Sequence, residues 1–281
     1  MTKTAPLAPG LHIAATPIGN LGDVTPRLLD ALRMADLILC EDTRVTGHLL
    51  SHFGIETSMR PYHDHNAAQT RPDVLAKLRD GAAIVLVSDA GTPLIADPGY
   101  KLVAEARAQE TPIFAIPGPS AVITALSIAG VPTDRFSFLG FLPPKQTARR
   151  KVLAEVADRY GETLVFYETA PRLANALSDI AAEFGDPDVV IGRELTKRHE
   201  EIVSGTASAL ANQYAEAPTK GEIVLIIAPR IAPAASDEDV DTLMQRALKT
   251  MRLKEASAHV ASLTGRRKRD LYQAYLGRQA P

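Results

Sequence analysis

The sequence predicts an α/β protein of two domains, followed by a small helical tail. Short apolar runs alternate with helical segments, a proline pair interrupts this alternation at FLPPK (141–145), and the last residues are rich in lysine and arginine. With 281 residues the chain is longer than the roughly 100–200 residues of a typical domain. We therefore expect α/β domains at 1–140 and 141–228, and a basic helical domain at 238–281.

The first domain is predicted to hold a mostly parallel sheet with helices on both faces, because strands and helices alternate. Thr25 and Pro26 have the residue types of a helix N-cap and a first helical position. Cys40 is expected to be a buried strand residue. The expected strands are 11–15, 37–40, 83–88, 113–116 and 136–139, and the expected helices are 26 onward, 41–53, 72–80, 98–109 and 120–129.

The second domain is predicted to have a mixed sheet. The strands at 189–193 and 201–204 have only a short connection, which favours antiparallel pairing. The other expected elements are strands at 163–167 and 222–228 and helices at 146–158, 171–184 and 206–214. A second linker is expected at 229–239, and the tail after it is helical, with Leu263, Leu271 and Leu276 as apolar anchors.

Composition and charge restrict the class of protein. Apolar residues make up 46% and charged residues 23% of the chain, as in an ordinary globular protein. No stretch approaches the roughly 18 apolar residues of a membrane span, and the first residues lack a secretion signal, so we expect a cytoplasmic protein without membrane contact. The single cysteine excludes an internal disulfide and a thiolate metal cluster.

The charge is unevenly distributed. The net charge is −2, yet residues 238–281 hold nine lysines and arginines against five acidic residues. This asymmetry predicts a separate segment that binds anions.

Three unusual turns follow predicted strands of the first domain. They are TPIGNLGD (16–23), SDAGTPLIADPG (88–99) and PGPSAV (117–122). Ligands of open α/β sheets bind at such turns, where backbone amides and helix N-termini converge. The first turn lacks the spacing of a dinucleotide fingerprint. The three turns together therefore predict a shared small-molecule cleft rather than a nicotinamide site.

Two further polar motifs allow more than one interpretation. EDTR (41–44) is either a helix start, with Asp42 or Thr43 as the cap and Arg44 solvated, or a substrate-facing network, which the closely spaced opposite charges favour. His63 and His65 alternate along an extended segment and have no further ligand pair, so hydrogen-bonded or RNA-facing histidines are favoured over a metal site, and we expect no metal.

The order of the motifs resembles the 16S rRNA (cytidine-2'-O)-methyltransferase family of the tetrapyrrole methylase superfamily. The motifs that carry the resemblance are TPIGNLGD, EDTR, PYHDHN, SDAGTPLIADPG, PGPSA, FLGFLPPK, FYETAPR, GRELTKRHEE and GEIVLII, with a similar helical tail. The resemblance implies the tetrapyrrole methylase fold with the cofactor cleft between its two domains, and a homodimer. It also implies S-adenosylmethionine as cofactor and, as substrate, a ribose 2'-hydroxyl in the decoding region of 16S rRNA in the small ribosomal subunit.

The resemblance also implies residue roles. The positions that match cofactor contacts are Ile18, Ser88, Asp89, Thr92, Ser120, Ala121, Tyr167, Glu168, Leu195, Gly221 and Glu222. Glu168 stands where tetrapyrrole enzymes tend to have methionine. The candidates for catalysis are Glu41, Asp42, Arg44, Lys197 and Glu200, and the motifs do not single out a general base among them. RNA binding is expected from the run Arg266, Arg267, Lys268 and Arg269.

Two other functions are compatible with these motifs. A tetrapyrrole C-methyltransferase would share the cofactor turns but would need no basic tail. A ribosome-assembly factor without enzymatic activity would bind RNA but not S-adenosylmethionine. The sequence leaves open the stage of ribosome assembly that is recognised and whether dimerisation is required.

Overall fold

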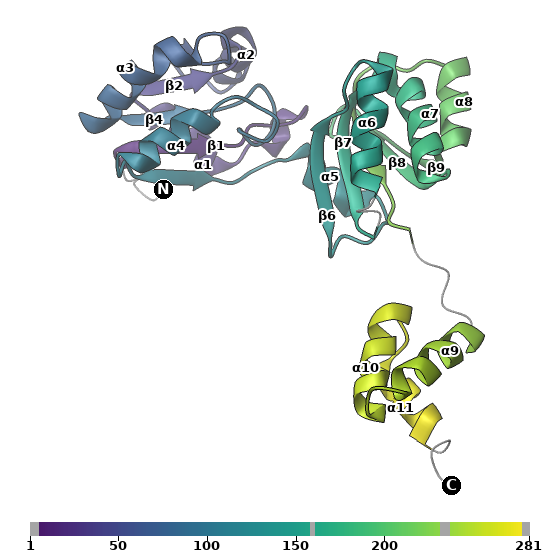
Figure 1. The fold of residues 1–281 in the computed structure, drawn as a ribbon. Helices are drawn as coiled ribbons and strands as arrows, with labels where there is room; N and C mark the ends of the chain where they lie inside the picture. Colours follow the sequence, from purple (N-terminus) through teal and green to yellow (C-terminus); the bar gives the residue numbers. More distant parts are fainter. Residues whose placement is uncertain (1–5, 158–160, 231–236, 277–281) are drawn as a thin grey trace. The chain divides into compact units, whose positions relative to one another are not determined.

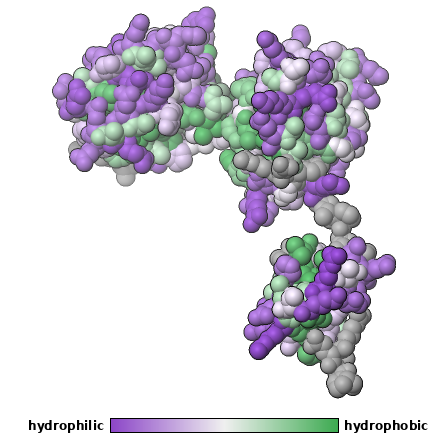
Figure 2. Space-filling model, in the orientation of Figure 1, coloured by the Kyte–Doolittle hydropathy of each residue, from purple (hydrophilic) through white to green (hydrophobic). Residues whose placement is uncertain are grey.

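The computed structural model describes residues 6–157, 161–230 and 237–276 and divides the chain into two compact units, Met1–Pro229 and Arg230–Pro281. The first unit contains two five-stranded sheets, and the second is helical (Figure 1). None of the described helices is long and apolar enough to cross a membrane. Hydrophilic residues predominate on the visible face of the helices around the first sheet (Figure 2).

The first sheet is parallel throughout, as predicted, with the strand order β3-β2-β4-β1-β5. Its strands are β1 (Gly10–Ala14), β2 (Leu37–Cys40), β3 (Met59–Pro61), β4 (Ala83–Leu86) and β5 (Ile113–Ile116). Helices α1 (Pro26–Met34) and α2 (Thr43–His52) pack on one face, and α3 (Ala67–Arg79) and α4 (Tyr100–Ala108) on the other. Cys40 is fully buried in β2.

Local sequence explains the start of α1 but not that of α3. The Thr25 hydroxyl accepts a hydrogen bond from the Leu28 amide and Pro26 is the first helical residue, as predicted. Helix α3 begins at Ala67 instead of Pro72, so the prediction of its start was wrong. A proline removes one helical hydrogen bond, but buried Val74 and its neighbours fix this helix on the sheet. The short strand β3 was not predicted.

The second sheet is mixed, as predicted, with the order β6-β7-β10-β8-β9. Strand β6 (Phe136–Phe141) is parallel to β7 (Thr163–Thr169), whereas β10 (Glu222–Ile227) is antiparallel to β7 and to β8 (Asp188–Arg193). Strand β8 pairs antiparallel with β9 (Glu201–Thr206). The helices packed on one face are α6 (Gln146–Ala157), α7 (Leu173–Phe184) and α8 (Ala207–Glu216).

The change from one sheet to the other comes earlier than the predicted boundary at 140/141. Strand β6 hydrogen-bonds to β7, and α5 (Ala121–Ile128) packs its Val122 and Leu126 in a cluster with Val165 and Val224 of the second sheet. The prolines of FLPPK follow a strand that already pairs with the second sheet. Two 3-10 turns complete this unit, at Leu21–Asp23 and Ala170–Arg172.

The helical unit consists of α9 (Asp237–Leu248), α10 (Leu253–Thr264) and α11 (Lys268–Leu276). Its core includes Met244, Val260 and Leu271. Of the three predicted apolar anchors only Leu271 is buried, since Leu263 and Leu276 are 58% and 48% exposed. The tyrosine hydroxyl of Tyr275 donates a hydrogen bond to Asp241, which ties α11 to α9.

Candidate active site

The three unusual turns lie together because they follow β4, β1 and β5, which are neighbours in the sheet. Thr16 and Gly91 exchange two backbone hydrogen bonds, of 2.9 and 3.1 Å. The Thr92 hydroxyl donates to the Pro119 carbonyl at 3.0 Å. Gly118 lies so close to Ala15 that a Cβ on it would be 3.1 Å from the Ala15 Cβ. The turns therefore form one connected edge.

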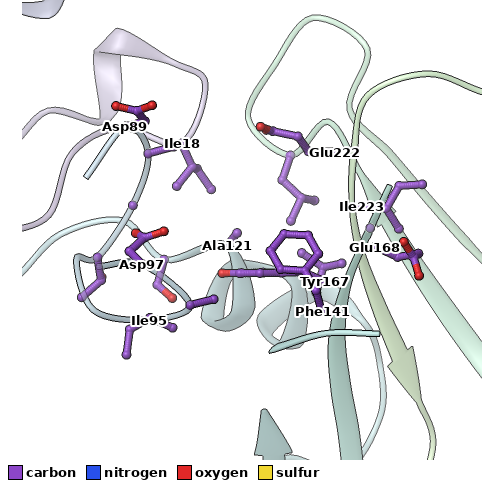
Figure 3. Close-up of a pocket in the computed structure, with 18 of the residues that line it drawn as sticks. Ile18, Asp89, Ile95, Asp97, Ala121, Phe141, Tyr167, Glu168, Glu222 and Ile223 are labelled. Carbon is purple, nitrogen blue, oxygen red and sulfur yellow. The ribbon is translucent and has the colours of Figure 1, made fainter. Parts of the chain in front are cut away.

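A pocket of about 340 Å³ opens at this edge and is also lined by the second sheet (Figure 3). The first turn contributes Ile18, the turn after β4 contributes Asp89 and Thr92, and the third turn contributes Ser120 and Ala121. The lining from the second sheet and its loops is Phe141, Tyr167, Glu168, Thr169, Gly192, Leu195, Gly221, Glu222, Ile223 and Val224. Ten of the eleven residues that the resemblance associates with the cofactor are thus brought together, and the exception is Ser88.

The chemistry of this pocket fits S-adenosylmethionine, which carries an adenine, a positive sulfonium and an amino-acid end. Carboxylates of Asp89, Asp97 and Glu222 line it and would attract the positive charges. Apolar side chains such as Ile18 and Ile223 offer a surface to the adenine. Gly91 forms a backbone cradle, since a Cβ on it would be 3.2 Å from Ile18.

Burial changes the titration of three lining residues, and it is the main reason that the pKa of the Asp89 carboxyl is raised. It raises the pKa of the Asp97 carboxyl, although a hydrogen bond from Ser88 opposes that shift. It raises the pKa of Tyr167 to about 12, with a smaller contribution from the charges of Asp97 and Glu222. These carboxylates give a bound cation a negative environment, which Lys197 offsets in part at Glu222, its ion-pair partner at 2.8 Å.

The turn after β4 holds two non-glycine residues in the left-handed region, Leu94 with φ 71° and Ala96 with φ 65°. Each such residue costs roughly 1–2 kcal/mol. Between them Ile95 is 41% exposed and lines the pocket. Strain of this kind concentrates at functional sites, where it fixes the shape of a binding surface.

Ser88 is buried behind the pocket lining, and the Glu168 side chain points away from the pocket. The Ser88 hydroxyl donates to the carbonyls of Ala90 and Gly91, both at 3.3 Å. The Glu168 carboxylate is buried and accepts a hydrogen bond from Arg172 Nε at 2.6 Å, because side chains alternate along β7 and Tyr167 takes the pocket face. At position 168 only the strand backbone is available to the cofactor.

The RELTK segment closes the pocket from the second sheet. Leu195 belongs to the same buried cluster as Ile18. The Lys197 ammonium donates to Glu194 at 2.9 Å and to Glu222 at 2.8 Å, and its aliphatic part lies over Gly19 of the first turn. A Cβ on Gly221, where φ is 101°, would be 2.5 Å from Glu194.

A second, polar recess of about 460 Å³ adjoins the pocket and shares Asp89 with it. It is lined by Glu41, Asp42, Thr43, Pro61, His63, His65 and Asp89. The EDTR and PYHDHN motifs meet here because they follow the neighbouring strands β2 and β3. Of the catalytic candidates, Glu41 and Asp42 line this recess.

Asp42 and Arg44 interact with each other at the start of α2. Asp42 is the N-cap of α2, and its carboxylate accepts from the Arg44 amide at 2.8 Å and from Arg44 Nε at 3.0 Å. The interaction with Arg44 lowers the pKa of Asp42 to about 2. The Arg44 side chain is 87% exposed. This arrangement supports the helix-start interpretation of EDTR for these two residues, which was the less favoured one.

The remaining catalytic candidates, Lys197 and Glu200, lie outside the lining of the recess. Glu200 accepts a hydrogen bond from the Thr196 amide within its own loop. The sequence motifs contained His63, His65 and Asp97 without assigning them to a site. The signal that could have placed them was the parallel sheet itself, which gathers the carboxyl ends of neighbouring strands at one edge.

The basic run of the helical unit is exposed at the start of α11. Arg266 forms an ion pair with Asp237 at 2.9 Å. In the described part of the chain, Arg267, Lys268 and Arg269 form no ion pair. Also among described residues, no group of three metal-ligating side chains is close enough to hold a metal ion.

Fold and pocket define the class of protein, a methyltransferase of the tetrapyrrole methylase type. The family model described as Tetrapyrrole (Corrin/Porphyrin) Methylases matches residues 10–211. Cobalt precorrin-4 methyltransferase, a cobalamin biosynthetic enzyme, superposes with a TM-score of 0.58 at 18% identity, over 79% of this chain and 96% of that chain. Diphthine synthase gives 0.61 at 15% identity, over 78% and 89%. These likenesses show the fold alone.

Curated relatives show which family of this class the chain belongs to. Proteins named ribosomal RNA small subunit methyltransferase I are 47% identical in Erythrobacter litoralis (96% of each chain) and 45% identical in Escherichia coli O157:H7 (96% of this chain and 95% of that protein). The model described as RsmI C-terminal HTH domain matches residues 234–279. The chain belongs to the ribosomal RNA small subunit methyltransferase I family, whose members are S-adenosylmethionine-dependent enzymes.

Proposed function

We propose that this protein transfers a methyl group from S-adenosylmethionine to the ribose 2'-hydroxyl of a cytidine in the decoding region of 16S rRNA, within the small ribosomal subunit. The observation that carries the proposal is a pocket with two sets of lining residues. One set comes from three turns of the first sheet, and the other comes from the second sheet and its loops. The full-length similarity to small subunit rRNA methyltransferases supports the substrate class.

The cofactor, when bound, supplies a methyl group on a positively charged sulfur. The chain then has to bind it, orient it and exclude water. Ile18, Ala121 and Leu195 would hold the apolar part, and Asp89 and Glu222 would face its charges. A transfer of this kind depends mainly on the alignment of the reacting atoms. The hydrogen bonds that join the turns to one another favour such alignment.

The helical unit would provide affinity for the RNA. Arg267, Lys268 and Arg269 are exposed and adjacent, and the family model for this segment is named for a helix-turn-helix. Contacts of lysine and arginine with phosphates position a nucleic acid without reading its sequence. Selection of the target nucleotide would then come from the first unit.

Two predicted properties fit this function. A ribosomal RNA substrate supports a cytoplasmic location. Apolar side chains outside the pocket lining are also exposed in the first unit, with Tyr100 at 73% and Ile123 at 54%, and they support a homodimer, because assembly would cover them.

The two alternative functions are less well supported. A tetrapyrrole substrate would leave the basic helical unit without a role, and the relatives that cover 96% of the chain are named for ribosomal RNA. A factor without enzymatic activity would have no need of a pocket with carboxylates and a strained turn.

The deciding experiment combines binding and product analysis. Calorimetry of the purified protein should detect S-adenosylmethionine binding. Small subunits from cells that lack the protein should gain one 2'-O-methylcytidine in 16S rRNA when treated with the protein and the cofactor, as measured by nucleoside mass spectrometry. Cofactor binding with no methyl gain in these particles would refute the substrate, and absence of cofactor binding would refute the activity.

A further inference from the structure

The polar recess contains one carboxylate that the fold does not use. Glu41 directly follows β2 and lines the recess. Its carboxylate makes no hydrogen bond and no ion pair with any residue that the structure describes. A partly buried carboxylate without a partner at a strand end costs stability rather than adding to it, and its oxygens are available to a ligand.

The neighbouring carboxylates of the recess already have partners. Asp42 caps α2 and binds Arg44. One oxygen of Asp89 accepts a hydrogen bond from the Asp42 amide at 3.0 Å, so Asp89 joins the recess to the cofactor pocket while it holds the EDTR turn. Glu41 is therefore the carboxylate of the recess that has no hydrogen-bond or ion-pair partner among the described residues.

Two histidine rings also line the recess. The rings of His63 and His65 lie with their centroids 5.9 Å apart at an interplanar angle of 66°. Histidine rings are among the side chains on which unstacked RNA bases pack. The recess is open to solvent, and its volume of about 460 Å³ leaves room for a nucleoside that enters from the surface.

Building on the proposed function, we infer that the recess receives the flipped-out target nucleoside, with its base against His63 and His65 and its ribose 2'-hydroxyl at the Glu41 carboxylate. Glu41 takes the proton of this hydroxyl. The oxygen–hydrogen electron pair stays on the ribose oxygen and forms the new bond to the methyl carbon, while the pair of the broken carbon–sulfur bond remains on sulfur. The proton passes from Glu41 to solvent after the transfer.

The surroundings of Glu41 suit a proton acceptor. Burial raises the pKa of its carboxyl, and the nearby charges of Asp89, Asp97, Asp64 and Asp42 add to this rise. The other groups facing it are His63 and His65, and Arg44 through its pair with Asp42. A general base is most effective when its pKa lies nearer the working pH. The rate of transfer should therefore fall as the pH drops through the raised pKa, because the protonated carboxyl cannot accept a proton.

The kinetic test uses unmethylated small subunits and single-turnover methyl transfer across pH. Glu41→Gln should lower the rate of methyl transfer by about 10²- to 10⁴-fold. It should also abolish the decrease of this rate at acidic pH. S-adenosylmethionine affinity, measured by calorimetry without RNA, should stay within twofold. The matched control is Asp64→Asn, which removes one negative charge beside Glu41 but lies outside the recess lining. This variant should keep the rate of methyl transfer within threefold. The decrease of the rate at acidic pH should shift to lower pH, because one charge that raises the pKa of Glu41 is gone.

A second measurement reads occupancy without turnover. Small subunits with 4-thiouridine at the target position are bound and irradiated, and the crosslinked peptide is identified by mass spectrometry. A crosslink in the segment 61–66 supports the inference. Crosslinks confined to other segments, or Glu41→Gln transfer at the wild-type rate and pH profile, would overturn it. The proposed function fails separately, if the wild-type protein methylates no cytidine in these particles.

Discussion

Replacement of Gly91 by alanine tests whether the pocket binds the cofactor. Gly91 has φ 80°, and a Cβ would be 3.2 Å from Ile18 Cγ2 and 3.7 Å from the Pro119 carbonyl. The left-handed backbone costs alanine roughly 1–2 kcal/mol, and crowding of buried Ile18 adds about 1–3 kcal/mol. We expect Gly91→Ala to destabilise the first unit by about 2–5 kcal/mol and to weaken S-adenosylmethionine binding at least about tenfold, or 1.4 kcal/mol.

Gly81→Ala is the matched control, because Gly81 has φ 90° and nothing within 4 Å of its Cβ position. It should share the backbone cost of roughly 1–2 kcal/mol and leave cofactor affinity within twofold. Thermal melting and calorimetry below both transition temperatures measure the two effects. A folded Gly91→Ala protein with wild-type affinity would show that the cofactor does not bind against this turn.

Three further outcomes are expected. Arg149→Met leaves Asp179 without its buried partner, since both side chains are 4% exposed. The free energy of unfolding, measured in urea, should therefore fall by about 3–5 kcal/mol. A loss below about 1 kcal/mol would mean that solvent reaches the pair. Tyr167 should ionise near pH 12 in an absorbance titration, because burial raises its pKa to about 12. Its contribution to stability is complete below the unfolded pKa of about 10 and is lost as the pH rises through 12, and Tyr167→Phe should remove this loss. An unchanged titration in that variant would contradict the assignment. Alanine at 267, 268 and 269 should make the plot of log RNA affinity against log salt concentration less steep by up to about 3 units of slope. Cofactor binding should stay unchanged. An unaltered slope would show that the basic run does not contact the RNA.

Much of the candidate site was predictable because it depends on position after a strand. TPIGNLGD and SDAGTPLIADPG each follow an apolar strand, and residues at such ends converge in a parallel sheet. Ile18, Asp89 and Ala121 accordingly line one pocket. The direction of individual side chains was less predictable, since Glu168 lies within the FYET motif but turns toward Arg172.

The interpretation of EDTR shows the limit of sequence reasoning at a site. The spacing of Asp42 and Arg44 allowed a helix cap or a substrate-facing network, and the two differ only in where the carboxylates point. The hydrogen bond from the Arg44 amide shows that Asp42 is a helix cap. Glu41 instead lines the recess together with Asp89. The two adjacent residues have different surroundings because Asp42 caps α2, whereas Glu41 lies in the bend between β2 and that cap.

The sequence by itself determined the class of fold, the strand–helix alternation of the first sheet and the mixed character of the second, because these follow from local apolar patterns and short connections. Only the tertiary structure decided that β6 and α5 belong with the second sheet and that Leu263 and Leu276 are exposed. Local patterns show that a segment has an apolar face, but not which surface covers it. That choice depends on packing between residues far apart in the chain, such as Val122 and Val224, which belong to one buried cluster.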